Sequence, residues 1–492
     1  MAKMNIQSEL NLKIKKIFPD MCINKNPDNY NFFNSLSIPP YIRDWLIMRF
    51  ARDDGSVDIE EIRDYINRYI PHREQWELIK STMIHDGLDS RFLAKIRVEI
   101  DVKTGKGLFY LPDFGFPKNK YEAEIISQLL IDKRDEILSN PETWGVLSLF
   151  WAIDSKSKSP GIGKVFLSDF EPFCPYQIDL NYFREARKEF TLNEWIDQLL
   201  LAIDYNPSAF SSKQEKLTVL SRLLPFIEKR VNIIELAPKS TGKSTIFSQI
   251  SKYGWLVSGG SVSRARLFYD VSRRAIGLVS RYDYVALDEI QSINFPDKEE
   301  IRGALKGYLE NGEYRVGDYR GVGDAGFVLL GNIYFDNMDI NKDMFLELPE
   351  IFSESALIDR FHGFIKGWNI PRMKENMSAT GWALNTEYFS EILHALREDI
   401  RYRSVVDRLI VLPKGSDTRD TKAIKKLATG YLKLLFPHII SLKDSDLNNF
   451  IRDFEEYCLN PSKNMRSIIR IQASLKDSEY KKEIPDIQCI QI

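Results

Sequence analysis

Residues 235–245 read ELAPKSTGKST and stand between a short apolar run and a helical pattern. The preceding residues 231–236 are rich in β-branched side chains, which is typical of a buried parallel strand. Ile246, Phe247 and Ile250 follow at helical spacing. A strand, a loop and a helix start in this order predict a phosphate-binding loop, because backbone N–H groups then surround an anion.

Two residues of this loop carry side chains suited to a nucleoside triphosphate. Lys243 is expected to contact the β- and γ-phosphates, and the Ser244 hydroxyl is expected to bind Mg²⁺. The phosphate-loop pattern G-x-x-x-x-G-K-S/T has glycine where Ala237 stands. A methyl group fits at that position only if φ is negative. The expected nucleotide-binding residues are Ala237, Pro238, Lys239, Ser240, Thr241, Gly242, Lys243, Ser244 and Thr245.

A second apolar run, residues 284–287, ends in the carboxylates Asp288 and Glu289. Asp288 is expected to act as the second ligand on the Mg²⁺ side, and Glu289 is expected to polarise the attacking water as general base. Acidic residues often end strands, so neither residue alone would indicate catalysis. Together with the phosphate loop they predict ATP hydrolysis.

Two further polar residues are candidates for the same reaction. Asn332 follows the apolar residues 326–331 and is expected to orient the water or touch the γ-phosphate, the alternative being a turn-forming asparagine. Arg360 precedes Phe361 after a helical turn and is a candidate arginine finger, the alternative being an ion pair with Asp359. A finger predicts an oligomer, because the arginine and the nucleotide would belong to different chains.

Basic side chains on two predicted hairpins are candidate DNA contacts. Residues 313–323 form a glycine-rich hairpin that carries Arg315, Tyr319 and Arg320. Alternating apolar residues 96–102, a turn and residues 108–111 form the other, with Lys103 and Lys106 in the turn. Solvated surface charge is the alternative in both places.

The 492 residues suffice for two or three domains. Short apolar strands at 231–236, 255–257, 284–287 and 327–330 alternate with helical stretches, which predicts an α/β fold with a parallel sheet and helices on both faces. The polar, basic residues 155–161 indicate a linker, and Thr191 with Glu194 predicts a capped helix over 192–204. The expected domains are 1–150, mixed α+β; 151–230, a helical connector; 231–370, the nucleotide-binding core; and 371–492, all-helical.

The overall composition limits the function only weakly. The 68 basic and 70 acidic residues nearly cancel, so a polyanion would have to meet a local patch. The four cysteines form no C-x-x-C pair, so neither a zinc site nor a disulfide framework is indicated. No apolar run has the length of a signal peptide core or a membrane span, which predicts a cytoplasmic protein without a membrane partner.

The motifs together carry a family resemblance. The phosphate loop, VALDE (285–289), YLENGEYRVG (308–317), GN (331–332) and DRF (359–361) resemble the AAA+ superfamily, in the branch with a hairpin before the first sensor. A closer resemblance, over about residues 30–440, is to the BrxL family, the Lon-like ATPases of BREX phage-defence systems. It is carried by ISKYGWLVSGG (250–260), LFYDVSRRAIGLVSRYDYVALDEI (267–290), RFHGFIKGWNIPR (360–372) and ATGYLKLLFP (428–437).

The resemblance implies more than the motifs do alone. It implies ATP and Mg²⁺, a ring of six subunits or a stacked pair of rings closing around double-stranded DNA, and other phage-defence proteins as partners. Arg360 stands at the family's finger position, and Arg419 or Lys422 is a candidate second sensor. Family members commonly continue into a Lon-type protease domain. Too few residues follow 428–437 for such a domain, so no protease activity is expected.

Two other functions remain open at this point. The same ATPase core serves protein remodellers that thread a polypeptide, although the basic hairpin favours nucleic acid. A scaffold that binds ATP and barely hydrolyses it is the third possibility, and the intact Asp288–Glu289 pair argues against it.

Overall fold

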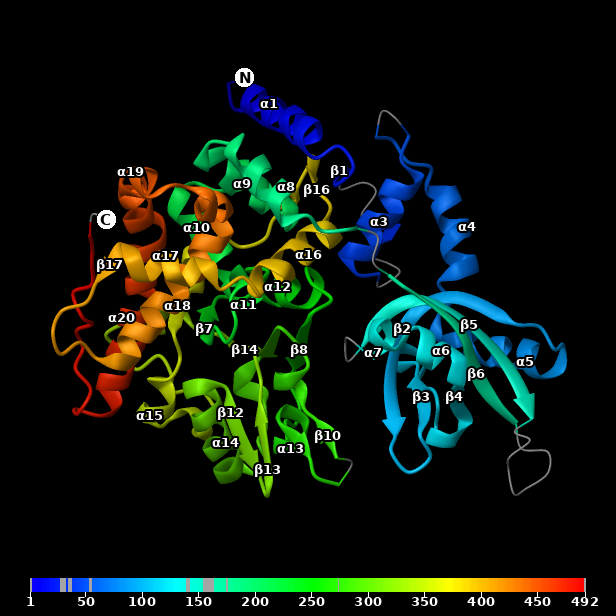
Figure 1. Cartoon of the computed structure of the whole chain (residues 1–492). Coiled ribbons are helices and arrows are strands. Elements are labelled where there is room, and N and C mark those ends of the chain that lie inside the picture. Colours follow the sequence, from blue (N-terminus) through cyan, green and yellow to red (C-terminus); the bar gives the residue numbers. More distant parts are fainter. Residues whose placement is uncertain are drawn as a thin grey trace. The chain divides into compact units, whose positions relative to one another are not determined.

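The computed structural model describes residues 2–26, 32–33, 38–52, 55–138, 142–153, 163–173, 176–272 and 274–490 (Figure 1). The chain forms two compact units. The smaller unit is Leu46–Pro175, and the larger unit combines Met1–Trp45 with Tyr176–Ile492. Helix α3 (Pro40–Phe50) crosses the division. The predicted linker 155–161 lies outside the described residues.

The smaller unit is built on a five-stranded sheet in the order β3-β2-β5-β6-β4, antiparallel except for the β4–β6 pair. The predicted hairpin is confirmed, with Asp101 opposite Lys106. Ile153 pairs with Gly163, so the sheet continues past residue 150 and the unit ends at Pro175 instead. Its elements are α4 (Ile59–Tyr69), α5 (Trp76–His85), β2 (Ser90–Asp101), β3 (Lys106–Tyr110), β4 (Ala123–Ile125), α6 (Ser127–Asp132), α7 (Arg134–Leu138), β5 (Thr143–Ile153) and β6 (Gly163–Pro172).

The first 45 residues belong to the larger unit, not to the N-terminal domain in which the sequence analysis placed them. Helix α1 (Ala2–Ile17) buries Leu10 and Ile14 in the core of this unit. Strand β1 (Cys22–Lys25) pairs antiparallel with β16 (Gly381–Leu384). These contacts join segments more than 350 positions apart, which no local pattern in the sequence indicates.

A parallel sheet in the order β15-β7-β14-β11-β8 forms the centre of the larger unit, and the predicted parallel sheet is therefore confirmed. Four of its strands lie where the sequence predicts them. The fifth, β15, was missed because it has four residues with glycine at one end and lysine at the other. The strands are β7 (Ile233–Ala237), β8 (Gly254–Ser258), β11 (Tyr284–Asp288), β14 (Gly326–Asn332) and β15 (Gly363–Lys366).

Alternate residues of each strand face opposite sides of the sheet, and helices cover both sides. Ile233, Ala286 and Val328 pack in one core, whereas Ile234 and Val285 pack in the other. The first core contains α9 (Leu192–Ala202), α11 (Leu224–Ile227), α12 (Lys243–Gln249), α16 (Thr386–Arg397) and α18 (Thr418–Leu435). The second contains α14 (Lys298–Asn311), α15 (Ser355–Ile358) and α20 (Asn460–Lys476).

Two hairpins lie side by side at one end of the larger unit (Figure 1). Strands β12 (Glu313–Val316) and β13 (Tyr319–Val322) form the predicted hairpin, which is confirmed. Strands β9 (Tyr269–Asp270) and β10 (Ala275–Ile276) form the other. The rings of Tyr269 and Tyr319 stack with centroids 3.7 Å apart, which joins the two hairpins.

The C-terminal part is mostly helical, but the expectation that it is all-helical is wrong. Besides β16, it contains β17 (Ile410–Val411), which pairs with β18 (Gln488–Cys489). Its further helices include α17 (Arg401–Leu409) and α19 (Asp444–Phe454). No helix within the described ranges has both the length and the apolar character that a membrane crossing requires.

Candidate active site

The register of the parallel sheet brings the predicted site residues to one edge. Ala237 at the end of β7 pairs with Asn332 at the end of β14, and β11 ends beside them with Asp288. Ligands of open parallel sheets bind at the carboxyl ends of the strands, where the chain crosses in two directions from a central strand. Strand β7 is such a strand, because the chain runs from β7 to β8 at one edge of the sheet and later from β14 past β7 to β15 at the other edge.

The loop after β7 has the backbone shape of an anion cradle. Ser240 and Gly242 have φ values of 65° and 72°, which lie in the left-handed region. Thr241 between them does not have a positive φ, so the two conformations alternate along the loop. Such alternation turns successive N–H groups toward one concave side. A Cβ on Gly242 would lie 2.3 Å from the Tyr205 hydroxyl, so only glycine fits there.

The departure from the strict motif at Ala237 has a structural compensation. Ala237 ends a strand and does not have a positive φ, so its methyl group is not strained. A Cβ built on Gly367 would lie 2.3 Å from the Cβ of Ala237. The methyl group of Ala237 therefore occupies space that glycine leaves open at position 367, a residue that sequence reasoning missed.

The side chain of Lys243 contacts Asn332, one of the predicted polar residues of the site. The Lys243 side chain is buried, and its Nζ donates to Oδ1 of Asn332 over 2.9 Å. Burial lowers the pKa of Lys243, while the carboxylates of Asp288 and Glu289 oppose that shift. Because Asn332 directs its side chain to the phosphate-loop lysine, its position favours a role in the site over a role in a turn.

Gln291 holds the strand end that carries Asn332, and sequence reasoning missed it. Its Nε2 donates to the backbone oxygen of Asn332 over 2.6 Å. A glutamine two residues after the DE pair gives no local signal for this role.

The two carboxylates after β11 have different environments. Asp288 is 4% exposed, and its Oδ1 accepts from the N–H of Glu289 over 2.9 Å. Glu289 is exposed and has a φ of 50°, a left-handed conformation that is strained for a residue with a Cβ. The turn thus separates a buried carboxylate, suited to a metal, from an accessible one, suited to water. Ser244 is half-buried at the start of α12.

The candidate finger is held within its own chain. The Arg360 Nε lies 3.2 Å from Oε2 of Glu310, and its guanidinium donates to the Ala356 carbonyl. The alternative partner, Asp359, is instead bound by other arginines, among them Arg419 and Arg466. Burial raises the pKa of Asp359, but these arginines lower it below its ordinary value.

The two second-sensor candidates lie in different surroundings. Arg419 donates to Glu310 and Asp359, so it shares Glu310 with Arg360. Neither arginine has a hydrogen bond or ion pair to the phosphate loop within the described part of the chain. Lys422 is exposed.

The hairpin residues differ in how accessible they are. Arg315 and Arg320 are exposed and stand directly opposite each other across β12 and β13. Directly opposed like charges destabilise a hairpin, so the pair favours an anionic partner. Tyr319 is half-buried against Tyr269.

The two lysines of the smaller unit also differ. Lys106 forms an ion pair with Glu124 over 2.7 Å, and Lys164 shares that carboxylate. Lys103 has an exposed side chain. Of the two, Lys103 is therefore the more available to an external anion.

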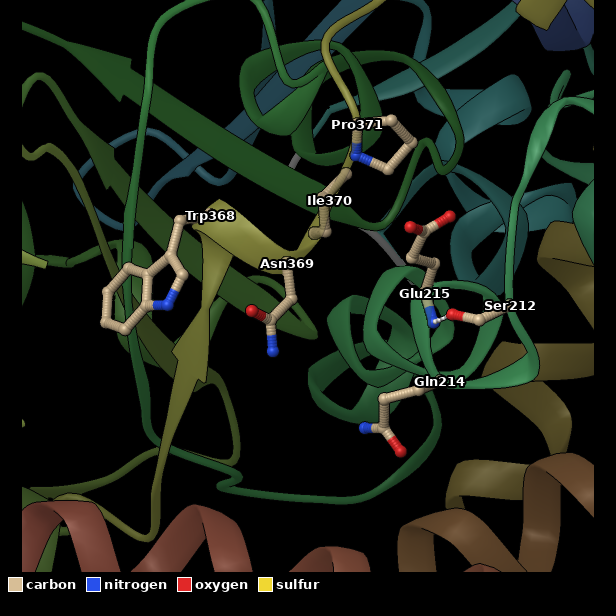
Figure 2. Close-up of a pocket in the computed structure, with 7 residues that line it drawn as sticks. All are labelled: Ser212, Gln214, Glu215, Trp368, Asn369, Ile370 and Pro371. Atoms are coloured by element: carbon tan, nitrogen blue, oxygen red, sulfur yellow. Dashed lines mark hydrogen bonds between the residues drawn. The ribbon is translucent and has the colours of Figure 1, made fainter. Parts of the chain in front are cut away.

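A cavity of about 370 Å³ lies between residues 212–215 and residues 368–371 (Figure 2). One wall belongs to the segment after β15, which contacts the phosphate loop at two points. Gly367 packs on Ala237, and the N–H of Met373 donates to the Ser240 carbonyl over 2.7 Å. The cavity is lined by Ser212, Gln214, Glu215, Trp368, Asn369, Ile370 and Pro371.

Two family models match almost the whole chain. The model described as "Lon-like protease BrxL-like, ATPase domain" matches residues 165–486, and "BREX system Lon protease-like protein BrxL N-terminal" matches residues 16–151. The chain belongs to the BrxL family. The predicted resemblance is confirmed, and the ATPase-domain match contains the phosphate loop and its polar partners.

Two curated relatives resemble the chain at 27% identity. Over 407 residues it resembles the Lon-like protease BrxL of Escherichia coli O9:H4 (strain HS), covering 82% of this chain and 57% of that protein. Over 461 residues it resembles the Lon-like protease BrxL of Bacillus cereus (strain H3081.97), covering 90% of this chain and 65% of that protein. The chain thus spans less than two thirds of the length of either relative.

Proposed function

We propose that this protein hydrolyses ATP at the edge of its parallel sheet. The observation that carries this proposal is the 2.9 Å hydrogen bond between Lys243 and Asn332, beside the buried Asp288. It supports a site in which the loop amides and Lys243 bind the phosphates. The Asn332 side chain would then orient the attacking water, and Glu289 would accept its proton.

Ser244 and Asp288 would hold Mg²⁺, which neutralises phosphate charge in such reactions. One hydroxyl and one carboxylate fit this ion, because Mg²⁺ usually keeps several waters and takes further ligands from substrate phosphates. Among the described residues no group of three His, Cys, Asp or Glu side chains converges as an all-protein metal site would require.

The cavity between residues 212–215 and residues 368–371 is suited to the nucleoside end of ATP. The segment that lines it is fixed to the phosphate loop at Ala237 and Ser240, so a triphosphate on the loop would place its base nearby. Asn369 offers an amide that can both donate and accept, as an adenine edge requires, and the Trp368 ring adds an apolar wall (Figure 2).

A neighbouring copy would complete the site. Arg360 and Arg419 both form ion pairs with Glu310 of their own chain, and among the described residues neither bonds to its own phosphate loop. This placement supports their action on the nucleotide of an adjacent subunit, with Arg360 as finger and Arg419 as second sensor. Lys422 remains the other second-sensor candidate. Heterologous contacts of this kind close into a ring, and we propose a ring of six or a stacked pair of rings.

The proposed polymer in the ring is double-stranded DNA, in phage defence together with other BREX proteins. The exposed Arg315 and Arg320 of the β12–β13 hairpin would contact the phosphate backbone, with Tyr319 supporting the hairpin. Lys103 and, more weakly, Lys106 would add contacts from the smaller unit. Tyr314 is buried and Tyr319 is stacked on Tyr269, so the hairpin exposes Arg315 and Arg320, beside Glu313 and Asp318, and no fully exposed aromatic ring, which favours DNA over a threaded polypeptide.

The proposed ATPase is tested with two variants. Lys243→Ala should lose ATP binding, because its buried amine is the side-chain cation expected to contact the β- and γ-phosphates. Glu289→Gln should bind ATP at parent affinity and lose about 10²- to 10⁴-fold in turnover. Binding is measured with a fluorescent ATP analogue and turnover by phosphate release. Parent turnover by Glu289→Gln would show that another group acts as base.

A further inference from the structure

A buried arginine lies directly behind the phosphate loop. Arg222 stands in a 3₁₀ turn, Ser221–Leu223, just before α11, and its side chain is fully buried. Its Nε and Nη2 donate to the two carboxylate oxygens of Glu235, over 2.9 and 2.5 Å. Glu235 is equally buried, on the face of β7 that carries Ile233. The two side chains therefore form a bidentate ion pair inside an apolar core.

The same guanidinium also reaches the far end of the loop. Its Nη1 donates to the backbone carbonyl of Thr241 over 2.9 Å. Thr241 is 1% exposed and immediately precedes Gly242. One side chain thus connects the strand before the loop to the last residue before the left-handed glycine.

This contact fixes the direction of a backbone N–H group. A trans peptide is planar, so the carbonyl of Thr241 and the N–H of Gly242 point in opposite directions. Holding the carbonyl toward Arg222 turns the Gly242 N–H away from the core. The Ser240 carbonyl is held in a similar way by the Met373 N–H over 2.7 Å, which fixes the N–H of Thr241.

We propose that Arg222 and Glu235 form a positioning pair for polyphosphate binding: they hold the Thr241 carbonyl so that the Gly242 N–H is aimed at a phosphate before the ligand arrives. The inference rests on the proposed function, because it requires a triphosphate on this loop. An N–H that is already oriented adds its hydrogen bond without a cost for ordering the loop.

The alternative is a pair that only stabilises the fold. Two apolar side chains of similar volume often stabilise a core at least as well as a buried ion pair does. Burial by itself lowers the pKa of Arg222, but Glu235 raises it above its ordinary value, so Arg222 remains charged. Stability and phosphate binding can therefore be separated by replacing both charges at once.

The test is the double variant Arg222→Met with Glu235→Leu. We expect a melting temperature within about 3 °C of the parent. The Kd for ATP should rise about tenfold, equivalent to about 1.4 kcal/mol, because the Thr241 carbonyl loses its anchor. The matched control is Arg184→Met with Asp399→Leu, a pair with a 2.7 Å contact that is 6% and 8% exposed. The control should leave the Kd for ATP unchanged.

Parent affinity for ATP in the double variant would overturn the inference, as would an equal loss in the control. If the double variant does not fold, Arg222→Lys keeps a cation opposite Glu235 but cannot make all three contacts from one nitrogen. Arg222→Lys should then weaken ATP binding while its melting temperature stays equal to that of the parent. An ATP affinity equal to that of the parent would again overturn the inference. Failure of the proposed function is distinguishable, because Lys243→Ala would then bind ATP like the parent.

Discussion

Gly367 gives a steric prediction that comes directly from the geometry of the site. A Cβ at this position would lie 2.3 Å from the Cβ of Ala237, 2.8 Å from the Leu236 carbonyl and 2.9 Å from the Cα of Ala237. Nonbonded carbon atoms prefer about 3.5–4.0 Å, so Gly367→Ala must push the two segments apart by about 1.2 Å or more. The atoms that move belong to the backbone entering the phosphate loop.

The expected cost follows from overpacking of a buried contact. Gly367→Ala should lower the free energy of unfolding by about 1–3 kcal/mol. It should also weaken ATP binding at least about tenfold, since about 1.4 kcal/mol of loop distortion suffices for that factor. The matched control is Gly303→Ala in α14, where a Cβ meets nothing within 4 Å. The control should be neutral or stabilising, because alanine favours a helix by about 1 kcal/mol.

A double-mutant cycle identifies the contact itself. Ala237→Gly removes the nearest carbon, so it should restore part of the stability and ATP affinity that Gly367→Ala loses. The coupling should be about 0.5–3 kcal/mol, and recovery should be incomplete because the Leu236 carbonyl stays in place. Thermal melts and titration with a fluorescent ATP analogue measure both quantities. Stability and ATP affinity of Gly367→Ala equal to those of the parent, or purely additive effects in the cycle, would show that the Gly367–Ala237 contact does not shape the loop.

Three further predictions concern single features. Asn332→Ala should lower turnover about 10²-fold while the Kd for ATP changes only a few-fold. A loss of ATP affinity as large as the loss of turnover would instead assign the residue to binding. Arg315→Ser with Arg320→Ser should weaken duplex DNA binding and reduce the salt slope by about 2, whereas an unchanged slope would place DNA elsewhere. Burial lowers the pKa of His438 from 6.5 to about 4. Between these pH values the unfolded chain binds a proton that the folded chain does not, so the free energy of unfolding falls as pH falls. This fall should be smaller in His438→Phe, and equal slopes in chemical denaturation would contradict the assignment.

The convergence of the candidate site residues at one edge of the sheet was predictable because its signals are local. The phosphate loop, the DE pair and Asn332 each follow an apolar strand, and parallel strands place their carboxyl ends at one edge. The register of β7 and β14, which the sequence did not specify, then brings Ala237 beside Asn332. Composition contributed almost nothing to this result.

The sequence did not indicate the residues that support the loop from elsewhere in the chain, because their contacts join distant segments. Gly367 lies against Ala237, and Arg222 reaches Thr241 across the core, without any periodic pattern that links them. The hydrogen bond from Arg419 in α18 to Glu310 in α14 likewise joins positions 109 residues apart. Short strands such as β15 were missed because four residues carry too little periodicity.

In the proposed mechanism two copies share each nucleotide, one through Lys243 and the next through Arg360. The most direct measurement is ATP turnover of a co-purified equal mixture of Lys243→Ala and Arg360→Ala chains. Each variant alone should be nearly inactive, whereas about a quarter of the interfaces in mixed assemblies should combine an intact loop with an intact finger. Turnover in the mixture well above either variant is the predicted result. Parent turnover by Arg360→Ala alone, or a mixture no more active than its components, would contradict the account.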